Sequence, residues 1–154
     1  MKIKLFTHTD LDGIGCAILM KNVYRNDKID IEYCDYGNVN DKIGSFLNKK
    51  DYIEYDKIFI TDISINEDIA NIIDELSCMK EFILLDHHKT AEWLNRFDWA
   101  KIEDYCSVFG IKTSGTFMLH KWLIENNEKY VKCNYSNSKD FVQLVNDYDT
   151  RPLS

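Results

Sequence analysis

Leu84-Leu85-Asp86-His87-His88 stands at residues 84–88, where an apolar run ends in one carboxylate and two adjacent histidines. Histidine is scarce in this chain, with four in all, so a pair directly behind an acidic residue is a strong signal. Consecutive side chains point in different directions, so one ring can bind a metal ion while the other faces a substrate group. Asp86 can hold a ring in a fixed tautomer from behind. The motif indicates chemistry at the end of a buried strand.

Two further apolar runs end in the same kind of cluster. The first leads into His8, Asp10 and Asp12, which occupy alternate positions. If this segment is extended, alternate side chains project to one side, so the three are expected to converge. The other run ends at Asp62, whose two oxygens can bridge paired cations roughly 3.5–4 Å apart. Imidazole nitrogens and carboxylate oxygens suit Mn²⁺, Mg²⁺ or Zn²⁺, so a metal site is predicted.

Later segments add candidates that are less specific. Asp147 and Asp149 lie close together near the end of the sequence, and the residues alone do not choose between them. Ser114 and Gly115 open a predicted helix, whose first amides either bind a substrate phosphate or are simply capped. Lys89 follows the two histidines and is a candidate phosphate contact, although a solvated lysine is the more common case.

The pattern along the chain predicts alternating strands and helices. Strands are expected over residues 2–7, 30–36, 57–61 and 81–85, and helices over 13–24, 38–47, 66–76, 114–125 and 139–145, with a short helix or turn at 93–97 and a polar loop at 134–138. Ser64, with Glu67 three residues later, is expected to cap the helix at 66–76. The alternation predicts an α/β fold with a mostly parallel sheet of about five strands flanked by helices. In such folds the chemistry lies at the carboxyl ends of the strands.

Composition limits the class of protein. The 154 residues suit one domain, and the formal net charge is −7, whereas nucleic-acid binders usually present a basic surface. Bound metal would therefore have to supply much of the positive charge for a phosphodiester substrate. No apolar run of about 18 residues is present, so membrane insertion is not expected. Five widely spaced cysteines without a Cys-x-x-Cys pair favour reduced thiols and a cytoplasmic location.

These motifs together resemble a known family. Asp86-His87-His88 resembles the signature of the DHH phosphoesterases, which include RecJ-like exonucleases, nanoRNases, cyclic-dinucleotide phosphodiesterases and family II pyrophosphatases. His8-Thr9-Asp10-Leu11-Asp12-Gly13 resembles the first motif of that family, and Asp62 resembles the second. Asp147 or Asp149 resembles the fourth. The resemblance implies that residues 1–154 form a DHH-type catalytic domain with three αβα layers.

The resemblance also implies a centre of two divalent cations, with Mn²⁺ preferred and Mg²⁺ as the alternative. One cation would be held by His8, Asp10 and Asp62, and the other by Asp12, Asp62, His87 and the fourth-motif aspartate. His88 would contact the scissile phosphate, with Asp86 behind it, while a water activated by both metals attacks phosphorus. Asp147 is favoured as the fourth-motif ligand because it ends an apolar stretch in the RecJ-type pattern. Asp149-Thr150 resembles the pyrophosphatase and nanoRNase branches, so Asp149 remains an alternative.

The expected function is hydrolysis of phosphodiester bonds in short or single-stranded nucleic acid. The alternatives are a small phosphate substrate, such as a cyclic dinucleotide or pyrophosphate, and a truncated metal-binding domain without full activity. Relatives in the resembled family carry a C-terminal substrate-binding domain after the fourth motif, and this sequence is expected to lack it. Unless the chain is a fragment, a homodimer mate or a partner chain would then be expected to complete the site.

Overall fold

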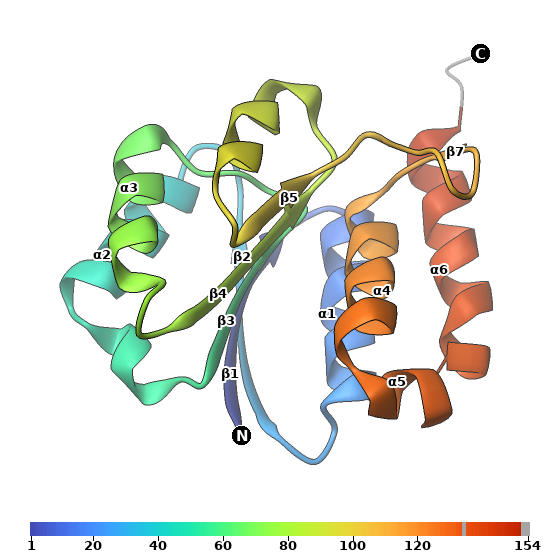
Figure 1. The fold of residues 1–154 in the computed structure, drawn as a ribbon, viewed down its shortest axis with the longest axis horizontal. Helices are drawn as coiled ribbons and strands as arrows, with labels where there is room; N and C mark the ends of the chain where they lie inside the picture. Colours follow the sequence, from blue (N-terminus) through green and yellow to red (C-terminus); the bar gives the residue numbers. More distant parts are fainter. Residues whose placement is uncertain (134, 152–154) are drawn as a thin grey trace.

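A parallel five-stranded sheet lies at the centre of the computed structural model, which describes residues 1–133 and 135–151 (Figure 1). Its strands are β1 (Lys2–His8), β2 (Lys28–Cys34), β3 (Lys57–Thr61), β4 (Glu81–Asp86) and β5 (Ala100–Ile102). They lie in the order β2-β1-β3-β4-β5, and each neighbouring pair is parallel. A short antiparallel hairpin, β6 (Tyr105–Cys106) and β7 (Ile111–Lys112), stands apart from the sheet. The predicted mostly parallel sheet is confirmed.

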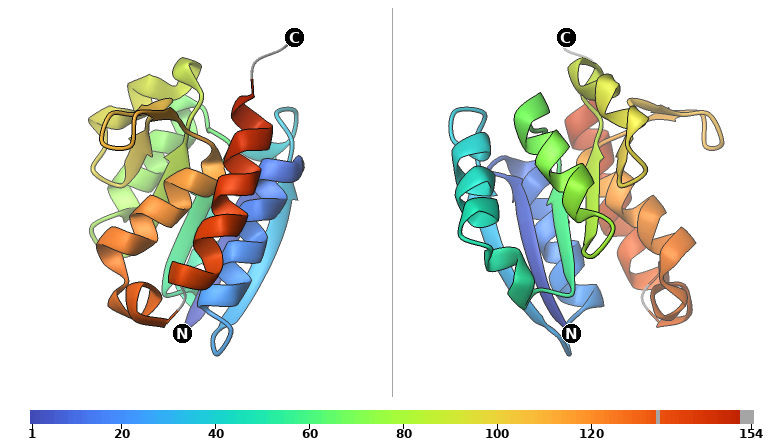
Figure 2. Two further views of the ribbon diagram at one scale, coloured as in Figure 1. Left: turned by 90° about the vertical axis from the view of Figure 1, so that its right-hand side faces the viewer. Right: turned by 60° about the vertical axis from the view of Figure 1, so that its left-hand side comes forward.

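Helices cover both faces of the sheet, which gives three layers (Figures 1 and 2). One face carries α2 (Val39–Asn48) and α3 (Glu67–Leu76), with the 3-10 segments η1 (Asp51–Glu54) and η2 (Lys89–Arg96). The other face carries α1 (Leu11–Val23) and α4 (Gly115–Asn126), and α6 (Tyr135–Thr150) packs on the outside of these two, after the short α5 (Glu128–Cys133). Among the described residues, no helix combines the length and hydrophobicity needed to cross a membrane.

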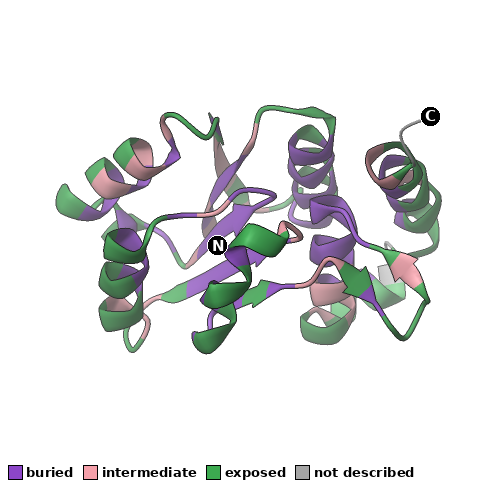
Figure 3. Ribbon diagram, turned by 90° about the horizontal axis from the view of Figure 1, so that it is seen from above, coloured by how far each residue is buried: buried purple, intermediate pink, exposed green. Residues whose placement is uncertain are grey.

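Strand alternation divides the core into two parts. Successive strand side chains point to opposite faces, so Ile58 and Ile60 pack toward α2 and α3, while Phe59 packs toward α1 and α4. The same alternation separates Leu84 from Leu85 in the neighbouring strand. Figure 3 shows that the strands of the sheet are buried and that the helices on either side have exposed outer surfaces. A strand buried on both faces requires a continuous apolar run, and β3 and β4 have one.

Several element boundaries differ from the prediction. The cap of α3 is Asn66, whose side chain accepts a hydrogen bond from the Ile69 amide, and Ser64 is used elsewhere. The predicted polar loop at 134–138 is wrong where it is described, because α6 already begins at Tyr135. Residue 134 lies outside the described residues. The short β5 was not predicted, because three residues are too few for a periodic signal.

Candidate metal centre

The carboxyl ends of three adjacent strands bring the predicted residues together. β1 ends at His8, β3 is followed by Asp62, and β4 ends at Asp86. β1 pairs with β3 and β3 pairs with β4, so these ends are side by side at one edge of the sheet. This is the edge where parallel α/β folds place their ligand-binding groups.

The first motif converges for a different reason from the one predicted. β1 ends at His8, and Asp10 caps α1 by accepting a hydrogen bond from the Gly13 amide at 2.9 Å. Asp12 therefore lies in the first helical turn and is not on the same extended segment as His8. Gly13 is required by this close turn, since a Cβ atom there would lie 1.9 Å from the carbonyl oxygen of His8.

Asp12 is held in place by the start of α4. Its Oδ2 accepts from the Gly115 amide at 2.7 Å and its Oδ1 from the Thr116 amide at 2.8 Å. The Thr116 hydroxyl also donates to the carbonyl oxygen of Asp12 at 2.9 Å. Asp12 is 1% exposed, and the positive end of the helix stabilises its charge. The amino end of α4 thus positions a carboxylate of the protein itself.

In this arrangement the residues predicted to contact a phosphate, Ser114 and Gly115, make hydrogen bonds within the protein. The Ser114 hydroxyl is fully buried and accepts the Phe117 amide as an N-cap, while the Gly115 amide is taken by Asp12. Neither group is free to bind a substrate. Lys89 is also not part of the cluster, since its ammonium lies 3.5 Å from Asp104 Oδ2 and its side chain is 76% exposed.

Asp62 is the most constrained residue of the centre. It is 1% exposed and has a φ of 59°, a left-handed conformation that is uncommon for residues other than glycine. Its Oδ1 lies 3.0 Å from His87 Nε2. Burial, together with the neighbouring carboxylates of Asp12 and Asp10, raises the pKa of Asp62 far above its ordinary value. Such backbone and electrostatic strain is typical of functional sites.

Two buried ligand atoms remain unsatisfied in this cluster. Among the described residues, neither His8 Nδ1 nor Asp62 Oδ2 makes a hydrogen bond of good geometry, although His8 Nδ1 lies 3.0 Å from Asp10 Oδ2 and 3.7 Å from Asp62 Oδ2. His8, Asp10 and Asp62 form one group of possible metal ligands, and Asp12, His87 and Asp149 form another. Within each group the ligand atoms lie within 4.8 Å of one another. Because buried polar atoms are normally paired, these residues fit bound divalent cations.

Asp86 positions His88 at the edge of the cluster, where Asp62, Asp86, His87 and His88 form a third group of possible metal ligands. Asp86 Oδ1 lies 2.7 Å from His88 Nδ1 and accepts the His87 amide, while Asp86 Oδ2 accepts the Ser64 hydroxyl at 2.5 Å. Burial opposes ionisation of Asp86, but these hydrogen bonds outweigh it and lower the pKa of Asp86. The bond to Asp86 in turn raises the pKa of His88. His87 points toward Asp62, so the two adjacent rings serve different directions, as the motif suggested.

The structure brings Asp149 to the cluster and leaves Asp147 outside. Asp149 Oδ2 lies 3.7 Å from His87 Nε2, whereas Asp147 is exposed and accepts a hydrogen bond from Gln143 one turn earlier. Residues two positions apart on an α-helix point in nearly opposite directions, so only one of the pair can face the sheet edge. Of the two candidates, the geometry therefore favours Asp149 over the preferred Asp147.

Two further residues at the site, Tyr36 and Ser64, are not among the predicted site residues. The Tyr36 ring centroid lies 4.8 Å from that of His8, and its hydroxyl lies 3.4 Å from His88 Nε2. Ser64 holds Asp86, as described above. Tyr36 was assigned to a strand over residues 30–36, but β2 ends at Cys34. The rule that strand ends meet at one edge could have identified it, since β2 pairs with β1.

Comparisons with known proteins agree with this geometry. Residues 2–145 match the family model described as the DHH family, N-terminal domain. The oligoribonuclease NrnB of Bacillus subtilis (strain 168) is 37% identical over 150 residues, which cover 95% of this chain and 36% of that protein. The chain thus spans about a third of the length of this curated relative.

Solved structures share the fold. An uncharacterized protein from Helicobacter pylori G27 superposes with a TM-score of 0.75 at 23% identity, over 98% of this chain and 44% of that one. An exonuclease RecJ bound to manganese gives a TM-score of 0.53 at 18% identity, over 77% of this chain and 31% of that one. The family model covers nearly the whole sequence, and the chain therefore belongs to the DHH family and carries its N-terminal domain.

Proposed function

We propose that this chain is a metal-dependent phosphodiesterase that acts on short nucleic acid, with short RNA as the foremost substrate. The observation that carries the proposal is the convergence of His8, Asp10, Asp12, Asp62, His87 and Asp149, in which the buried atoms His8 Nδ1 and Asp62 Oδ2 make no hydrogen bond of good geometry among the described residues. A positively charged ligand suits such a cluster, because its carboxylates repel one another. The 37% identity to an oligoribonuclease supports the choice of substrate.

Two divalent cations are proposed to bind here, with Mn²⁺ preferred and Mg²⁺ as the alternative. His8, Asp10 and Asp62 would hold one, and Asp12, Asp62, His87 and Asp149 the other. When bound, such cations activate a water molecule and neutralise the charge of a phosphodiester. The mixture of imidazole and carboxylate ligands favours Mn²⁺ over Ca²⁺, which prefers oxygen ligands alone.

The remaining polar residues position and stabilise the substrate. His88 is proposed to donate to a phosphate oxygen from Nε2, because Asp86 occupies its Nδ1 and keeps that proton in place. The raised pKa of His88 favours the protonated, donating form of the ring. Its side chain is 36% exposed, so a substrate can reach it. Asp86 acts through His88 and is a positioning residue.

The low positive charge of the chain points to short substrates. There are 19 Lys and Arg residues against 26 Asp and Glu residues. Long single strands are usually gripped by many cationic contacts that release counterions, and few are available here. A dinucleotide needs only the metal centre and its immediate surroundings.

The test is a substrate panel with the Mn²⁺-loaded chain at one salt concentration. It compares an RNA dinucleotide with a 20-residue RNA strand, a cyclic dinucleotide and pyrophosphate, and uses Asp62→Asn as the inactive control. We expect the dinucleotide to be hydrolysed most efficiently, and Asp62→Asn to lose that activity. Faster turnover of pyrophosphate or the cyclic dinucleotide would contradict the proposed substrate, while equal rates for both proteins would show a contaminating nuclease.

A further inference from the structure

An open cavity of about 380 Å³ adjoins the metal centre on the side of His88. It lies between the start of α2, the loop before α3, and η2, and none of its lining residues except His88 and Asp86 is among the predicted site residues. Its wall includes Tyr36, Asn40, Ser64, Asn66, His88 and Trp93. His88 lines this cavity and is also the proposed phosphate contact. The cavity would therefore lie directly beside a bound phosphate. Its volume lies in the range of small-molecule sites, roughly 300–1,000 Å³.

The charge of the cavity excludes a second phosphate as its occupant. No lysine or arginine lines it, and Asp86, its one carboxylate, is already paired with His88 and Ser64. The cavity beside His87 is different, since Lys112 and Arg151 line it together with Asp149. Apart from the paired His88 and Asp86, the lining is uncharged and suits a neutral group that carries hydrogen-bond acceptors.

Two asparagines give this wall defined donors. Asn40 Oδ1 accepts the Asn66 amide at 2.8 Å, and Asn66 Oδ1 accepts the Ile69 amide at 3.0 Å. A backbone N–H can only donate, so both side-chain amides have a fixed orientation. Within the described part of the chain, neither side-chain NH₂ group has a hydrogen-bond partner. Each can therefore donate to a ligand.

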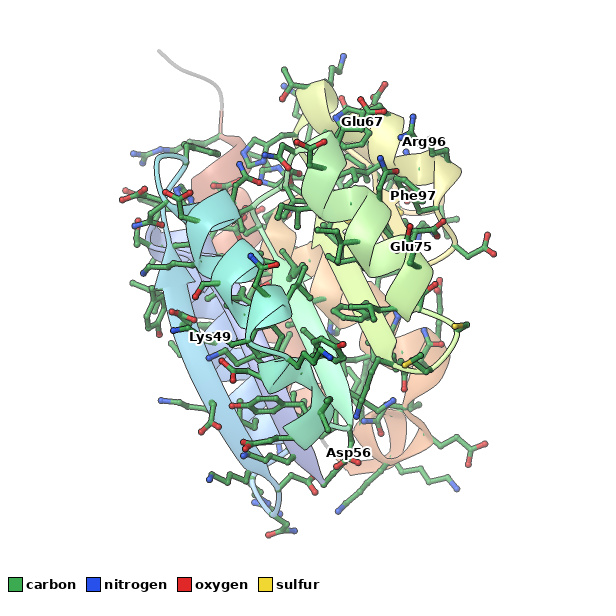
Figure 4. All side chains as sticks on the ribbon, turned by 90° about the vertical axis from the view of Figure 1, so that its left-hand side faces the viewer. Lys49, Asp56, Glu67, Glu75, Arg96 and Phe97 are labelled. Atoms are coloured by element: carbon green, nitrogen blue, oxygen red, sulfur yellow. The ribbon has the colours of Figure 1, made fainter. Side chains whose placement is uncertain are left out.

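An aromatic ring stands on a well-anchored segment beside these donors. Trp93 is 37% exposed although it is a large apolar side chain. The Arg96 guanidinium lies 5.4 Å from the Trp93 ring centroid, and Arg96 also contacts Glu67 of α3 at 3.4 Å (Figure 4). The Ala91 amide bonds to the His88 carbonyl oxygen, which ties η2 to the DHH motif. The indole thus lies at the cavity on a segment that is tied to the DHH motif by its backbone.

We propose that this cavity binds the nucleobase next to the scissile phosphate, stacked on Trp93 and read by the NH₂ groups of Asn40 and Asn66. The proposal rests on the proposed function and extends it to substrate recognition. A nucleobase has a flat apolar face and acceptor atoms on its edge, which match an exposed indole and two fixed donors. Stacking of one base on an aromatic side chain is worth about 1–3 kcal/mol, or roughly five- to 150-fold in affinity.

The test measures binding without turnover. The Mg²⁺-loaded chain is titrated calorimetrically with AMP and with ribose 5-phosphate, which share phosphate and sugar and differ by the base. We expect AMP to bind about tenfold or more tightly, and Trp93→Leu to remove most of that ratio while ribose 5-phosphate binds as before. Trp122→Phe, on the other side of the sheet, is the matched control and should keep the ratio.

Asn66→Asp tests the proposed donor separately. Aspartate keeps the oxygen that caps α3 but removes the NH₂ group, and its added charge affects both ligands alike. The ratio of the two affinities should therefore fall. Equal affinities in the unaltered chain, or an unchanged ratio in Trp93→Leu, would overturn the base-binding proposal. Hydrolysis of the dinucleotide is judged independently, so failure of either proposal is recognisable by itself.

Discussion

Asp12 and Asp62 are neighbours in the site and are buried to the same degree, yet their carboxylates differ in hydrogen bonding. Asp12 has both carboxylate oxygens paired with amides at the start of α4. Asp62 has one oxygen without a hydrogen bond among the described residues, and its backbone is left-handed. Burying a carboxylate oxygen without a partner costs free energy. Such an oxygen is therefore expected where a bound ligand supplies the partner. The fold therefore orients Asp12 by itself, and each of its oxygens keeps a lone pair for a cation, whereas one oxygen of Asp62 has no hydrogen-bond partner among the described residues.

Asp62→Asn should have the largest effect, because Asp62 is proposed to bind both cations and an amide cannot supply an anionic ligand oxygen. We expect metal binding to be lost and dinucleotide hydrolysis to fall by at least the roughly 10²–10³-fold that loss of one transition-state contact produces. The metal-free variant should nevertheless unfold at about the same temperature as the metal-free unaltered chain, since the raised pKa of Asp62 already favours its uncharged form and Asn is uncharged as well. Metal analysis and thermal unfolding measure the two effects. Full metal content in the variant would contradict the comparison.

The two histidines should separate in phenotype. His87→Ala should lower metal content, because its Nε2 lies 3.0 Å from Asp62 Oδ1 and 3.4 Å from Asp12 Oδ2. His88→Ala should keep the metal and reduce kcat by about 10²–10³-fold, as expected for one lost donor to the transition state. Equilibrium metal titration and steady-state kinetics distinguish them. Equal loss of metal from both variants would show that His88 is also a ligand.

Gly115→Ala should disturb Asp12 and Asp62 together, with a smaller effect than the preceding substitutions. A Cβ atom at residue 115 would lie 2.5 Å from Asp62 Cβ, while the Gly115 amide holds Asp12. Overpacking of this kind costs about 1–3 kcal/mol, and we expect metal affinity to fall as Asp62 moves. Gly44→Ala in α2 is the control, because its Cβ would meet only the end of the Ile69 side chain at 3.3 Å. Urea unfolding compares the two, and equal losses would argue against a special role for residue 115.

The sequence located the edge of the site better than it explained the contacts within it. His8, Asp62 and His87 could be predicted to meet, because parallel strand ends share one edge. The partners of Asp12 could not, since the amides that hold it come from residues more than 100 positions later. The fourth-motif aspartate depends on the rotation of α6, which a two-residue difference in sequence does not reveal. Ser64 and Asn66 are both good caps, and only the packed structure shows that Asp86 takes the hydroxyl of Ser64.

His120 is a third buried ionisable side chain, and it lies remote from the metal centre. Burial lowers the pKa of His120 to about 4, and its Nδ1 pairs with the Tyr130 hydroxyl. The folded pKa lies below the ordinary 6.5, so the folded state rejects a proton that the unfolded chain accepts. This contribution to stability is complete above pH 6.5 and declines as the pH falls toward 4.

The smallest predicted effect is the removal of this pH dependence by His120→Gln. Between pH 7.5 and pH 5, we expect the unaltered chain to lose about 1–2 kcal/mol more unfolding free energy than the variant, as the linkage of one proton requires. Urea unfolding of both proteins at the two pH values measures the difference. The carboxylates of the site titrate in both proteins and cancel in the comparison. A variant that loses as much stability as the unaltered chain would show that His120 is protonated in the folded state as readily as in the unfolded one.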